Sequence, residues 1–583
     1  MFMLRAFGST LLSLVFALSV AAQAQPPAAK EKSDGPGTIS GRVVNESGQP
    51  VSNAIVYVRT AGLSGVGVPP FTASTDREGA FQVMGLDPAA YYVSVSAPAY
   101  TQPAREPTSA PVPTYRPGDS MTLTLIKGGA VTGTVLNNAG EPVVGIAVRV
   151  QMIRDHNGRA LPRGAVRERT TDDRGIYRVY GLTTGTYVVS AGGPTESSNA
   201  LINAFEYDVA TYAPSSTREG AGQVSVRAGE EVSGIDIRYR AEPGRTVSGE
   251  VKVANPDAGF AVTLVAAGDI SAQWSTNSYQ NPGSSGFTFY GVGDGDYDVY
   301  AQFYTQSGER GVSEQQRISV RGADVSGIML ITKPFGSITG RLVVEEATVA
   351  ECKDKERPLF NETMISAWHN ENAAAKRTPQ AVWALGTPAP ADAEGKFVLK
   401  NVAAGEYFFA ARTQAKFWYL RSVSFTPPAN ASAKTPVKLV DATRVWTTIK
   451  PGEALAGVTL TFAHGAASLR GKLGDGEQAA PRTVVYLIPA ERERAEEVLH
   501  YFGSLISPEA KFAFNNVPPG RYWLLAQTLP ENEGQSPSRH RFPHETAFRA
   551  GLRREAEAKK NEIELKPCQN VADFQISLKA PVQ

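Results

Sequence analysis

The phrase "DDRGIYRVYGLTTGTYVVSA", residues 172–191, occurs five times in recognisable form along this chain of 583 residues. Close copies begin at Asp76 and Asp392, and looser copies begin at Ser284 and Pro508. Each copy contains an alternating run with aromatic residues, a short turn, and a tyrosine that opens a second alternating run. Alternation of apolar and polar residues is typical of strands with one buried face. The repeats therefore predict a series of related β-sheet units.

Two further phrases complete each unit. The first precedes the copy and reads apolar-x-Gly-x-apolar, with the glycines Gly41, Gly133, Gly249, Gly340 and Gly471. The second closes the unit with "MTLTLI", "VSGIDIRY", "VSGIMLI", "LAGVTLTF" or "VADFQISL". We divide the chain into units 1 to 5, with the boundaries 37–128, 129–242, 243–334, 335–465 and 466–583. Each unit has the size of a small domain, so the predicted fold class is all-β: a tandem array of about five Greek-key β-sandwiches.

Within a copy, the alternation predicts which side chains face the core. In unit 2 these are Tyr177 and Val179, with Leu182 closing one end of the core. The glycines of the turn suit a backbone position with φ > 0. They are Gly185, Gly295, Gly405 and Gly520. The tyrosine two residues later predicts a tyrosine corner, in which the hydroxyl bonds to loop backbone. The corner tyrosines are Tyr91, Tyr187, Tyr297, Tyr407 and Tyr522.

Two stretches of unit 5 depart from the β pattern. Residues 491–505, "ERERAEEVLHYFGSL", and residues 544–565, "HETAFRAGLRREAEAKKNEIEL", are rich in Ala, Glu, Arg and Lys with spaced apolar residues. This composition favours helix. We expect two short helical decorations on the last sandwich, and a helix that docks a partner is the alternative.

The first 24 residues have the features of a signal peptide. Arg5 precedes the apolar run 11–22, and "AQA" at 22–24 fits a small-x-small cleavage site. We expect residues 25–36 to form a linker and the processed chain not to span a membrane; an uncleaved anchor is the alternative. The protein is then exported, and periplasmic, outer-surface or secreted. In such a compartment Cys352 and Cys568 either form a disulfide or remain two thiols, and the sequence leaves both open.

Composition and motifs argue against several classes of protein. The 58 Lys and Arg against 57 Asp and Glu leave a net charge of +1, whereas nucleic-acid binders usually have a basic excess. His540 and His544 have an i, i+4 spacing, but Pro543 interrupts a helix that could present both. The calcium-like spacing in "DGDYD", residues 294–298, fits Asp-led turns better. No Gly-x-Ser-x-Gly motif occurs. We expect no catalytic residue, metal or cofactor.

The stretch "GTISGRVVNESGQPVSNAIVYV", followed by "TDREGAFQVMGLDPAAYYVSVSAPAY", resembles the carboxypeptidase regulatory-like domain. Units 1 and 2 match well, unit 4 moderately, and units 3 and 5 mainly in their second halves. The resemblance implies transthyretin-like (prealbumin-like) sandwiches, which are grouped with a broader carbohydrate-binding-like fold. It does not name a function, because this module accompanies many different proteins.

Aromatic rings exposed on a sheet face are what stacking on a sugar requires. The candidates for carbohydrate contact are Trp274, Trp418, Tyr419 and Trp446. The alternative is that a tryptophan in an alternating strand belongs to the core.

The expected function is that of an exported, non-enzymatic binding or scaffold protein of the cell envelope, with short linkers that suit a rod-like spacer. Its partner would be an envelope protein or a polysaccharide. One alternative is an extracellular or periplasmic carbohydrate-binding protein. The other is an accessory subunit of a secreted peptidase or of an outer-membrane uptake complex.

Overall fold

The computed structural model describes most of the chain after residue 36. The described residues are 37–61, 70–103, 113–156, 158, 160–161, 164–193, 205–253, 255, 258–268, 273–277, 285–350, 352, 356–370, 388–426, 439–474, 483–507, 510–528 and 545–576. The predicted signal peptide (1–24), the linker (25–36) and the histidines at 540 and 544 lie outside them.

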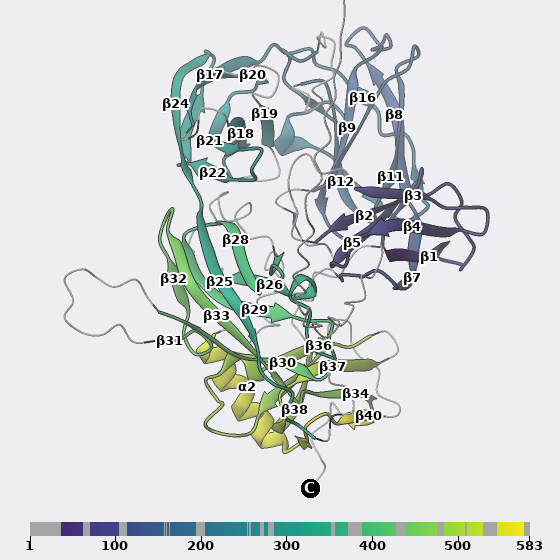
Figure 1. Ribbon diagram of the computed structural model, residues 1–583. Coiled ribbons are helices and arrows are strands. Elements are labelled where there is room, and N and C mark those ends of the chain that lie inside the picture. Colours follow the sequence, from purple (N-terminus) through teal and green to yellow (C-terminus); the bar gives the residue numbers. More distant parts are fainter. Residues whose placement is uncertain are drawn as a thin grey trace, which may run out of the picture.

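Unit 1 is a sandwich of two sheets (Figure 1). Its strands are β1 (Gly37–Asn45), β2 (Ile55–Thr60), β3 (Phe71–Ser74), β4 (Ala80–Leu86), β5 (Tyr91–Ser96), β6 (Tyr100–Thr101) and β7 (Ser120–Lys127). One sheet has the order β4-β1-β7-β6 and the other β3-β2-β5. Their inner faces meet in one core that includes Ile39, Val56 and Phe81, each at most 5% exposed.

Unit 2 repeats this plan. Its elements are β8 (Gly129–Leu136), β9 (Ala147–Arg154), β10 (Val166–Thr170), β11 (Ile176–Leu182), β12 (Gly185–Ala191), β13 (Thr211–Tyr212), η1 (Arg218–Gly220), β14 (Gln223–Val226), β15 (Glu231–Val232) and β16 (Ile237–Arg238). One sheet is β11-β8-β15, with β16 also on β8; the other is β10-β9-β12-β13, with β14 also on β12. Tyr177, Val179 and Leu182 are buried between the sheets, as predicted.

Unit 3 joins its two layers into one sheet. Its strands are β17 (Arg245–Lys252), β18 (Gly259–Ala266), β19 (Gln273–Asn277), β20 (Gly286–Val292), β21 (Gly295–Tyr304), β22 (Arg310–Ser313), β23 (Gln316–Val320) and β24 (Val325–Pro334). The order is β19-β18-β21-β22-β24-β17-β20, with β23 on β21. The short strand β22 pairs with both β21 and β24, so the sheet continues around one side of the core.

Unit 4 again has two sheets, β28-β25-β33-β30-β31 and β27-β26-β29-β32. Its elements are β25 (Gly336–Val344), η2 (Phe360–Glu362), β26 (Met364–His369), β27 (Ala389–Pro390), β28 (Lys396–Val402), β29 (Gly405–Arg412), β30 (Trp418–Phe425), β31 (Val440–Asp441), β32 (Thr447–Ile449) and β33 (Ala454–His464). Its core contains large rings such as Phe397, Phe409 and Trp418.

Unit 5 is a sandwich whose described residues include the helix α2. Its elements are β34 (Ala467–Leu473), β35 (Thr483–Pro489), η3 (Val498–His500), β36 (Phe502–Leu505), β37 (Lys511–Val517), β38 (Gly520–Thr528), α2 (Thr546–Lys559), β39 (Glu562–Leu565) and β40 (Asn570–Ile576). The sheets are β37-β34-β40 and β36-β35-β38-β39. Leu552 and Ala556 of α2 pack on the outer face of the second sheet, so every residue of β35 is buried.

The first strand of each unit explains the recurring phrases. It pairs antiparallel with the strand of the central phrase on one side and parallel with the closing strand on the other. A parallel neighbour requires the chain to cross over, and the intervening strands form the second layer meanwhile. The predicted fold class, an all-β tandem array of sandwiches, is confirmed.

One of the two predicted helices is wrong. Residues 544–565 do contain α2, over Thr546–Lys559, but residues 491–505 form bends, the 3₁₀ turn η3 and the strand β36. Leu505 of β36 pairs with Val484 at the edge of β35, and Val498 and Tyr501 are buried. Pairing with a sheet edge and side-chain burial here outweigh a modest preference for helix.

The prediction of φ > 0 at the turn glycine holds in two units and is wrong in two, and every central turn has a left-handed residue earlier in the chain. The residues with φ between 54° and 79° are Gly85, Gly181, Gly291, Asn401 and Asn516, where the central strand bulges. Gly405 and Gly520 have φ of 154° and 153°, whereas Gly185 and Gly295 have no positive φ. Gly185 lies at the start of β12, where it pairs with Val226 of β14.

Candidate functional site

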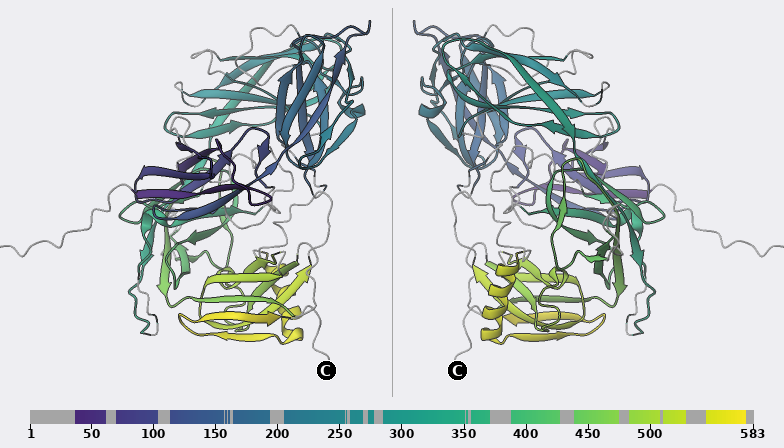
Figure 2. Two further views of the ribbon diagram at one scale, coloured as in Figure 1. Left: turned by 90° about the vertical axis from the view of Figure 1, so that its right-hand side faces the viewer. Right: turned by 90° about the vertical axis from the view of Figure 1, so that its left-hand side faces the viewer.

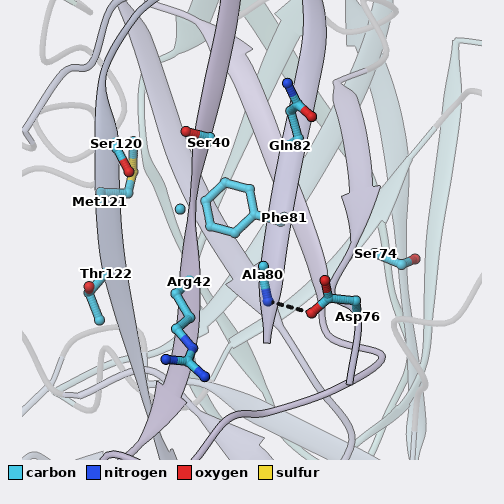
Figure 3. Close-up of a pocket in the computed structure, with 11 residues that line it drawn as sticks. Ser40, Arg42, Ser74, Asp76, Ala80, Phe81, Gln82, Ser120, Met121 and Thr122 are labelled. Atoms are coloured by element: carbon cyan, nitrogen blue, oxygen red, sulfur yellow. Dashed lines mark hydrogen bonds between the residues drawn. The ribbon is translucent and has the colours of Figure 1, made fainter. Parts of the chain in front are cut away.

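An open depression of about 810 Å³ lies on unit 1, over the outer face of β4, β1 and β7 (Figure 3). The strand register places Gln82, Ser40 and Ser120 in one row across the three strands. Ala80, Arg42 and Thr122 form the next row. Amide, hydroxyl and guanidinium groups thus lie side by side on a nearly flat surface, which we call the polar face. Such groups can hydrogen-bond a polar ligand or an extended peptide.

Local hydrogen bonds position the polar face. Arg42 donates through Nε to the carbonyl of Glu78 at 2.6 Å. The Asp76 carboxylate accepts from the backbone N–H groups of Glu78 and Ala80, at 3.0 and 2.7 Å. Asp76 is therefore part of the turn, in which an Asp side chain bonds nearby backbone N–H groups. Phe81, at 5% exposed, belongs to the core beneath the face.

The tyrosine that follows each central turn makes the same contact in all five units. Its hydroxyl donates to the carbonyl four residues earlier, at 2.6 to 2.9 Å: Asp87, Thr183, Gly293, Ala403 and Pro518. The five rings are at most 6% exposed. Burial raises the pKa of Tyr297 and of Tyr407 to about 12, so these hydroxyls remain protonated donors at neutral pH.

The four aromatic candidates for sugar contact lie at different positions in the structure. Trp274 lies in β19, opposite Leu264 of β18. Trp418 is completely buried in unit 4, and its indole donates to the carbonyl of Glu356 at 2.8 Å. A buried ring offers no face on which a pyranose could stack.

The other two candidates are partly buried. Tyr419 is the neighbour of Trp418 on β30, and burial raises its pKa. Trp446 lies just before β32, with its ring centroid 4.1 Å from that of Phe408. Each of these rings therefore already contacts the protein on one side.

The carboxylates of the acidic segment 294–298 bind donors within the protein. Asp294 accepts from the N–H of Gly322 at 2.8 Å. Asp296 accepts from Ser319 and Arg321, at 2.6 and 2.8 Å, and Asp298 pairs with Arg317. Three carboxylates that bind four different donors do not converge on one point, as calcium ligands must.

Cys352, His464 and Cys568 form a cluster that sequence spacing does not reveal. The two cysteines are joined by a disulfide, and their Cα atoms are 5.2 Å apart although 216 residues separate them in sequence. The sulfurs and an imidazole nitrogen of His464 all lie within 4.8 Å of one another. Because the three residues come from three different segments, only the tertiary fold brings them together.

Unit 1 contacts unit 4 directly. Arg116 pairs with Glu362 at 3.4 Å, and Gln414 donates to the hydroxyl and the carbonyl of Thr114 at 3.1 and 3.3 Å. An apolar cluster joins Ala61 and Ala90 of unit 1 to Met364 of unit 4. Both views of Figure 2 place the strands of unit 1 beside those of unit 4. The chain therefore folds back on itself, which corrects the expected rod.

Short contacts also tie consecutive units together. Asn401 of unit 4 accepts from the N–H of Arg310 and donates to the carbonyl of Gly308 in unit 3, at 2.8 and 3.0 Å. Tyr207 of unit 2 packs on Tyr290 of unit 3, with centroids 4.8 Å apart. The N–H of Gly229 in unit 2 donates to the carbonyl of Lys127 in unit 1 at 2.8 Å. Units 1 to 4 thus form a closed set of neighbours, and unit 5 is attached to unit 4. Among the described residues, no helix is long and apolar enough to cross a membrane.

These features define a multidomain β-sandwich protein in which the sandwiches are docked on one another. Residues 38–122, which make up most of unit 1, match the family model of the carboxypeptidase regulatory-like domain. The resemblance stated from the sequence is thereby confirmed for that part of the chain. No curated protein matches the chain.

Several solved structures are similar to parts of the chain. The TIE protein of Bacillus anthracis is 14% identical with a TM-score of 0.14, over 52% of this chain and 51% of its own. GBS52, the minor pilin of Streptococcus agalactiae, is 13% identical with a TM-score of 0.19, over 35% and 96%. BcpA, the major pilin subunit of Bacillus cereus, is 12% identical with a TM-score of 0.13, over 57% and 99%. The chain thus spans about half the length of the TIE protein, and TM-scores this low establish no shared function.

Proposed function

We propose that this chain is an exported, non-enzymatic scaffold of the cell envelope that holds binding faces in fixed relative positions. The observation that carries the proposal is the contact between units 1 and 4, made by residues 246 to 300 positions apart in sequence. A flexible string of domains would leave its sandwiches free to reorient, whereas docking at every junction restrains them. The chain would then act as a frame, located in the periplasm, on the outer surface or outside the cell.

The proposal includes the domain boundaries 37–128, 129–242, 243–334, 335–465 and 466–583. Each range contains its own buried cluster, built around Phe81, Tyr177, Phe287, Phe397 or Phe512. A separate core is what makes a domain stable as a unit. We assign the buried tyrosines at each central turn the structural role of corner pins, because each ties a strand start to the preceding loop.

The polar face of unit 1 is the binding surface that this scaffold would present. Ser40, Gln82 and Thr122 lie on its outer side, away from the sandwich core. Their hydroxyl and amide groups also favour a second candidate function, carbohydrate binding, because a polysaccharide offers matching donors and acceptors. An envelope protein and a polysaccharide are thus the two partners to distinguish.

Site-specific photocrosslinking of the full-length chain in its own cells tests the scaffold. A photoreactive amino acid at Gln82, on the polar face, is expected to give adducts of discrete mass in the envelope fraction. The same group at Glu564, an exposed residue of β39, is the matched control and is expected to give none. A chain that stays in the cytoplasm, or one whose Gln82 and Glu564 adducts are identical, would contradict the proposal.

Polysaccharide pull-down with the purified chain tests the alternative. If unit 1 binds carbohydrate, Gln82→Ala and Arg42→Ala weaken retention on the envelope polysaccharide, and Glu564→Ala does not. If the wild-type chain is not retained on the polysaccharide, the carbohydrate-binding hypothesis is rejected, and an envelope protein remains as the proposed partner. Each of these substitutions changes an exposed side chain, so the fold is expected to persist.

A further inference from the structure

The cluster of Cys352, His464 and Cys568 lies at the junction of units 4 and 5. Cys352 follows β25 in unit 4, and His464 is the last residue of β33. Cys568 belongs to the turn between β39 and β40 in unit 5. The direct chain link between the units is Gly465 and Ala466, immediately after His464. The disulfide is therefore a second covalent connection across the same junction.

Backbone hydrogen bonds hold the three segments in place. The N–H of Cys568 donates to the carbonyl of Gly465 at 3.1 Å. The N–H groups of Gly465 and Ala466 both donate to the carbonyl of Phe417, at 2.8 and 2.9 Å. The turn that carries Cys568 is thus fixed to the linker that follows His464 by contacts that do not involve the sulfur atoms. We expect this arrangement to persist when the disulfide is reduced.

Trp418 helps to position the other two members of the cluster. Its backbone pairs with that of His464, and the two rings are 4.8 Å apart. Its indole N–H holds the carbonyl of Glu356, four residues after Cys352 in sequence. Cys352 and His464 are 2% and 7% exposed, whereas Cys568 is partly exposed. The cluster is therefore enclosed on the unit 4 side and accessible from the side of Cys568.

We propose that the cluster is a redox-gated binding site for a thiophilic divalent metal ion of the zinc class. A dithiol reductant donates two electrons and two protons to the disulfide, which breaks the S–S bond, yields two thiols and leaves the reductant as a disulfide. The metal ion then displaces the two thiol protons and binds both thiolates and the imidazole of His464. A water molecule completes a four-coordinate site.

The geometry and the charge of the cluster suit this ion. Bond lengths of about 2.3 Å to sulfur and about 2.0 Å to nitrogen bring tetrahedral donors to within about 4 Å of one another. The three donor atoms are already within 4.8 Å. Two thiolates neutralise a divalent cation, so the filled site carries no net charge, as a largely buried site requires. The ion would replace a covalent connection between units 4 and 5 by a coordinated one.

Cobalt(II) binding to the full chain tests the proposal, because Co²⁺ substitutes for Zn²⁺ and its absorption reports thiolate ligation. The chain is reduced with a phosphine, desalted without oxygen and titrated with Co²⁺. We expect one Co²⁺ per reduced chain, with thiolate charge-transfer bands and the visible bands of tetrahedral coordination, and none in the oxidised chain. His464→Ala should weaken Co²⁺ binding at least tenfold, and Cys568→Ser, which leaves a single thiolate, should weaken binding and lower the charge-transfer absorption per bound Co²⁺. His156→Ala, which changes an exposed histidine of unit 2, should have no effect.

Three results would overturn the proposal. The first is a reduced chain that binds no Co²⁺ although its circular dichroism is unchanged. The second is binding that His464→Ala leaves at full strength, which would mean that the thiolates alone, or residues elsewhere, hold the ion. The third is loss of the β-sheet signal on reduction, because the site requires a chain that is both reduced and folded.

Discussion

Gly340 of β25 lies directly opposite Phe397 of β28, and the aromatic ring covers the glycine. An ideal Cβ at this glycine would lie 2.6 Å from Cζ of the ring and 2.1 Å from the carbonyl oxygen of Val458 on β33. The same cross-strand pair occurs in the other units: Gly41–Phe81, Gly133–Tyr177, Gly249–Phe287 and Gly471–Phe512. The glycine of the opening phrase thus leaves room for the aromatic side chain of the central phrase, which helps to fix the strand register.

Gly340→Ala is expected to destabilise unit 4 by about 1–3 kcal/mol, because the added methyl group forces the ring or the neighbouring strand to shift. Differential scanning calorimetry of the full chain should show this as a lower melting temperature for one transition. Gly551→Ala is the matched control. Gly551 lies in α2, and an ideal Cβ there would meet no atom within 4 Å. The same change at this position should therefore raise stability by about 0.5–1 kcal/mol. A neutral Gly340→Ala would contradict the packing role of the glycine.

Substitutions of Tyr187 test the structural role proposed for the corner tyrosines. Its hydroxyl donates to the carbonyl of Thr183 at 2.6 Å and its side chain is 1% exposed. Tyr187→Phe should cost about 1–3 kcal/mol, because the part-buried carbonyl of Thr183 loses its donor. Tyr187→Ala should cost about 3–5 kcal/mol through the cavity that it leaves. Tyr180→Phe, on the exposed side of β11, should be nearly neutral.

Urea unfolding of the full chain measures these costs. If Tyr187→Ala left the stability of unit 2 unchanged and weakened ligand binding instead, the tyrosines would be ligand platforms and the structural role would be wrong.

His500 should make unit 5 less stable in acid. Burial, together with the guanidinium groups of Arg494 and Arg444, lowers the pKa of His500 to about 4 and outweighs the carboxylate of Glu497, 3.2 Å from Nδ1. In the unfolded chain the pKa is about 6.5, so the unfolded state binds the proton first as the pH falls. The contribution of neutral His500 to the free energy of unfolding is therefore fully present above about pH 6.5. It decreases as the pH falls from about 6.5 to about 4, by about 3 kcal/mol in total.

The measurement is the free energy of unfolding at several pH values between 4 and 7 for the wild type and two variants. His500→Gln should flatten the dependence, whereas His156→Gln, at an exposed site in unit 2, should leave it unchanged. An identical slope in the wild type and in His500→Gln would assign the acid sensitivity to other groups.

Met364 tests the docking of unit 1 on unit 4. The side chain is 7% exposed and packs against Ala61 and Ala90. Met364→Arg buries an unpaired charge in this contact, which costs several kcal/mol unless the units separate. Small-angle scattering should therefore show a larger radius of gyration for the full chain. Met84→Arg, at a side chain that is 68% exposed, is the control and should leave the radius unchanged. Equal radii for the wild type and Met364→Arg would mean that the contact does not restrain unit 1.

The repeated phrases predicted the strands and their inward-facing residues well. Phe512 and Phe514 alternate inward on β37 as Tyr177 and Val179 do on β11. The sequence-based prediction failed where the local conformation depended on pairing with an adjacent strand. The sequence predicts φ > 0 at Gly185, which instead has no positive φ and starts the pairing of β12 with β14. The composition of residues 491–505 predicts helix, but their last residues pair with the edge of β35 as the strand β36.

The candidate binding sites show even more clearly that local sequence does not predict what depends on tertiary packing. The indole ring of Trp418 could by its chemistry stack on a sugar. In the structure it lies inside the core, and its N–H donates to the backbone carbonyl of Glu356, which belongs to a different segment. The polar face of unit 1 has no signature beyond outward-facing Ser40, Gln82 and Thr122 on three strands. Those residues become one surface only when β1 pairs with both β4 and β7.

The sequence alone determined the period of the strands, the aromatic and tyrosine positions of each unit, and hence the class of fold. These features follow from interactions between residues close in the chain, and alternation records which side of a strand is buried. The tertiary structure decided that unit 1 returns to unit 4 and that Cys352 and Cys568 meet beside His464. Such contacts join residues more than 100 positions apart, and they depend on how whole surfaces pack, which no local pattern encodes.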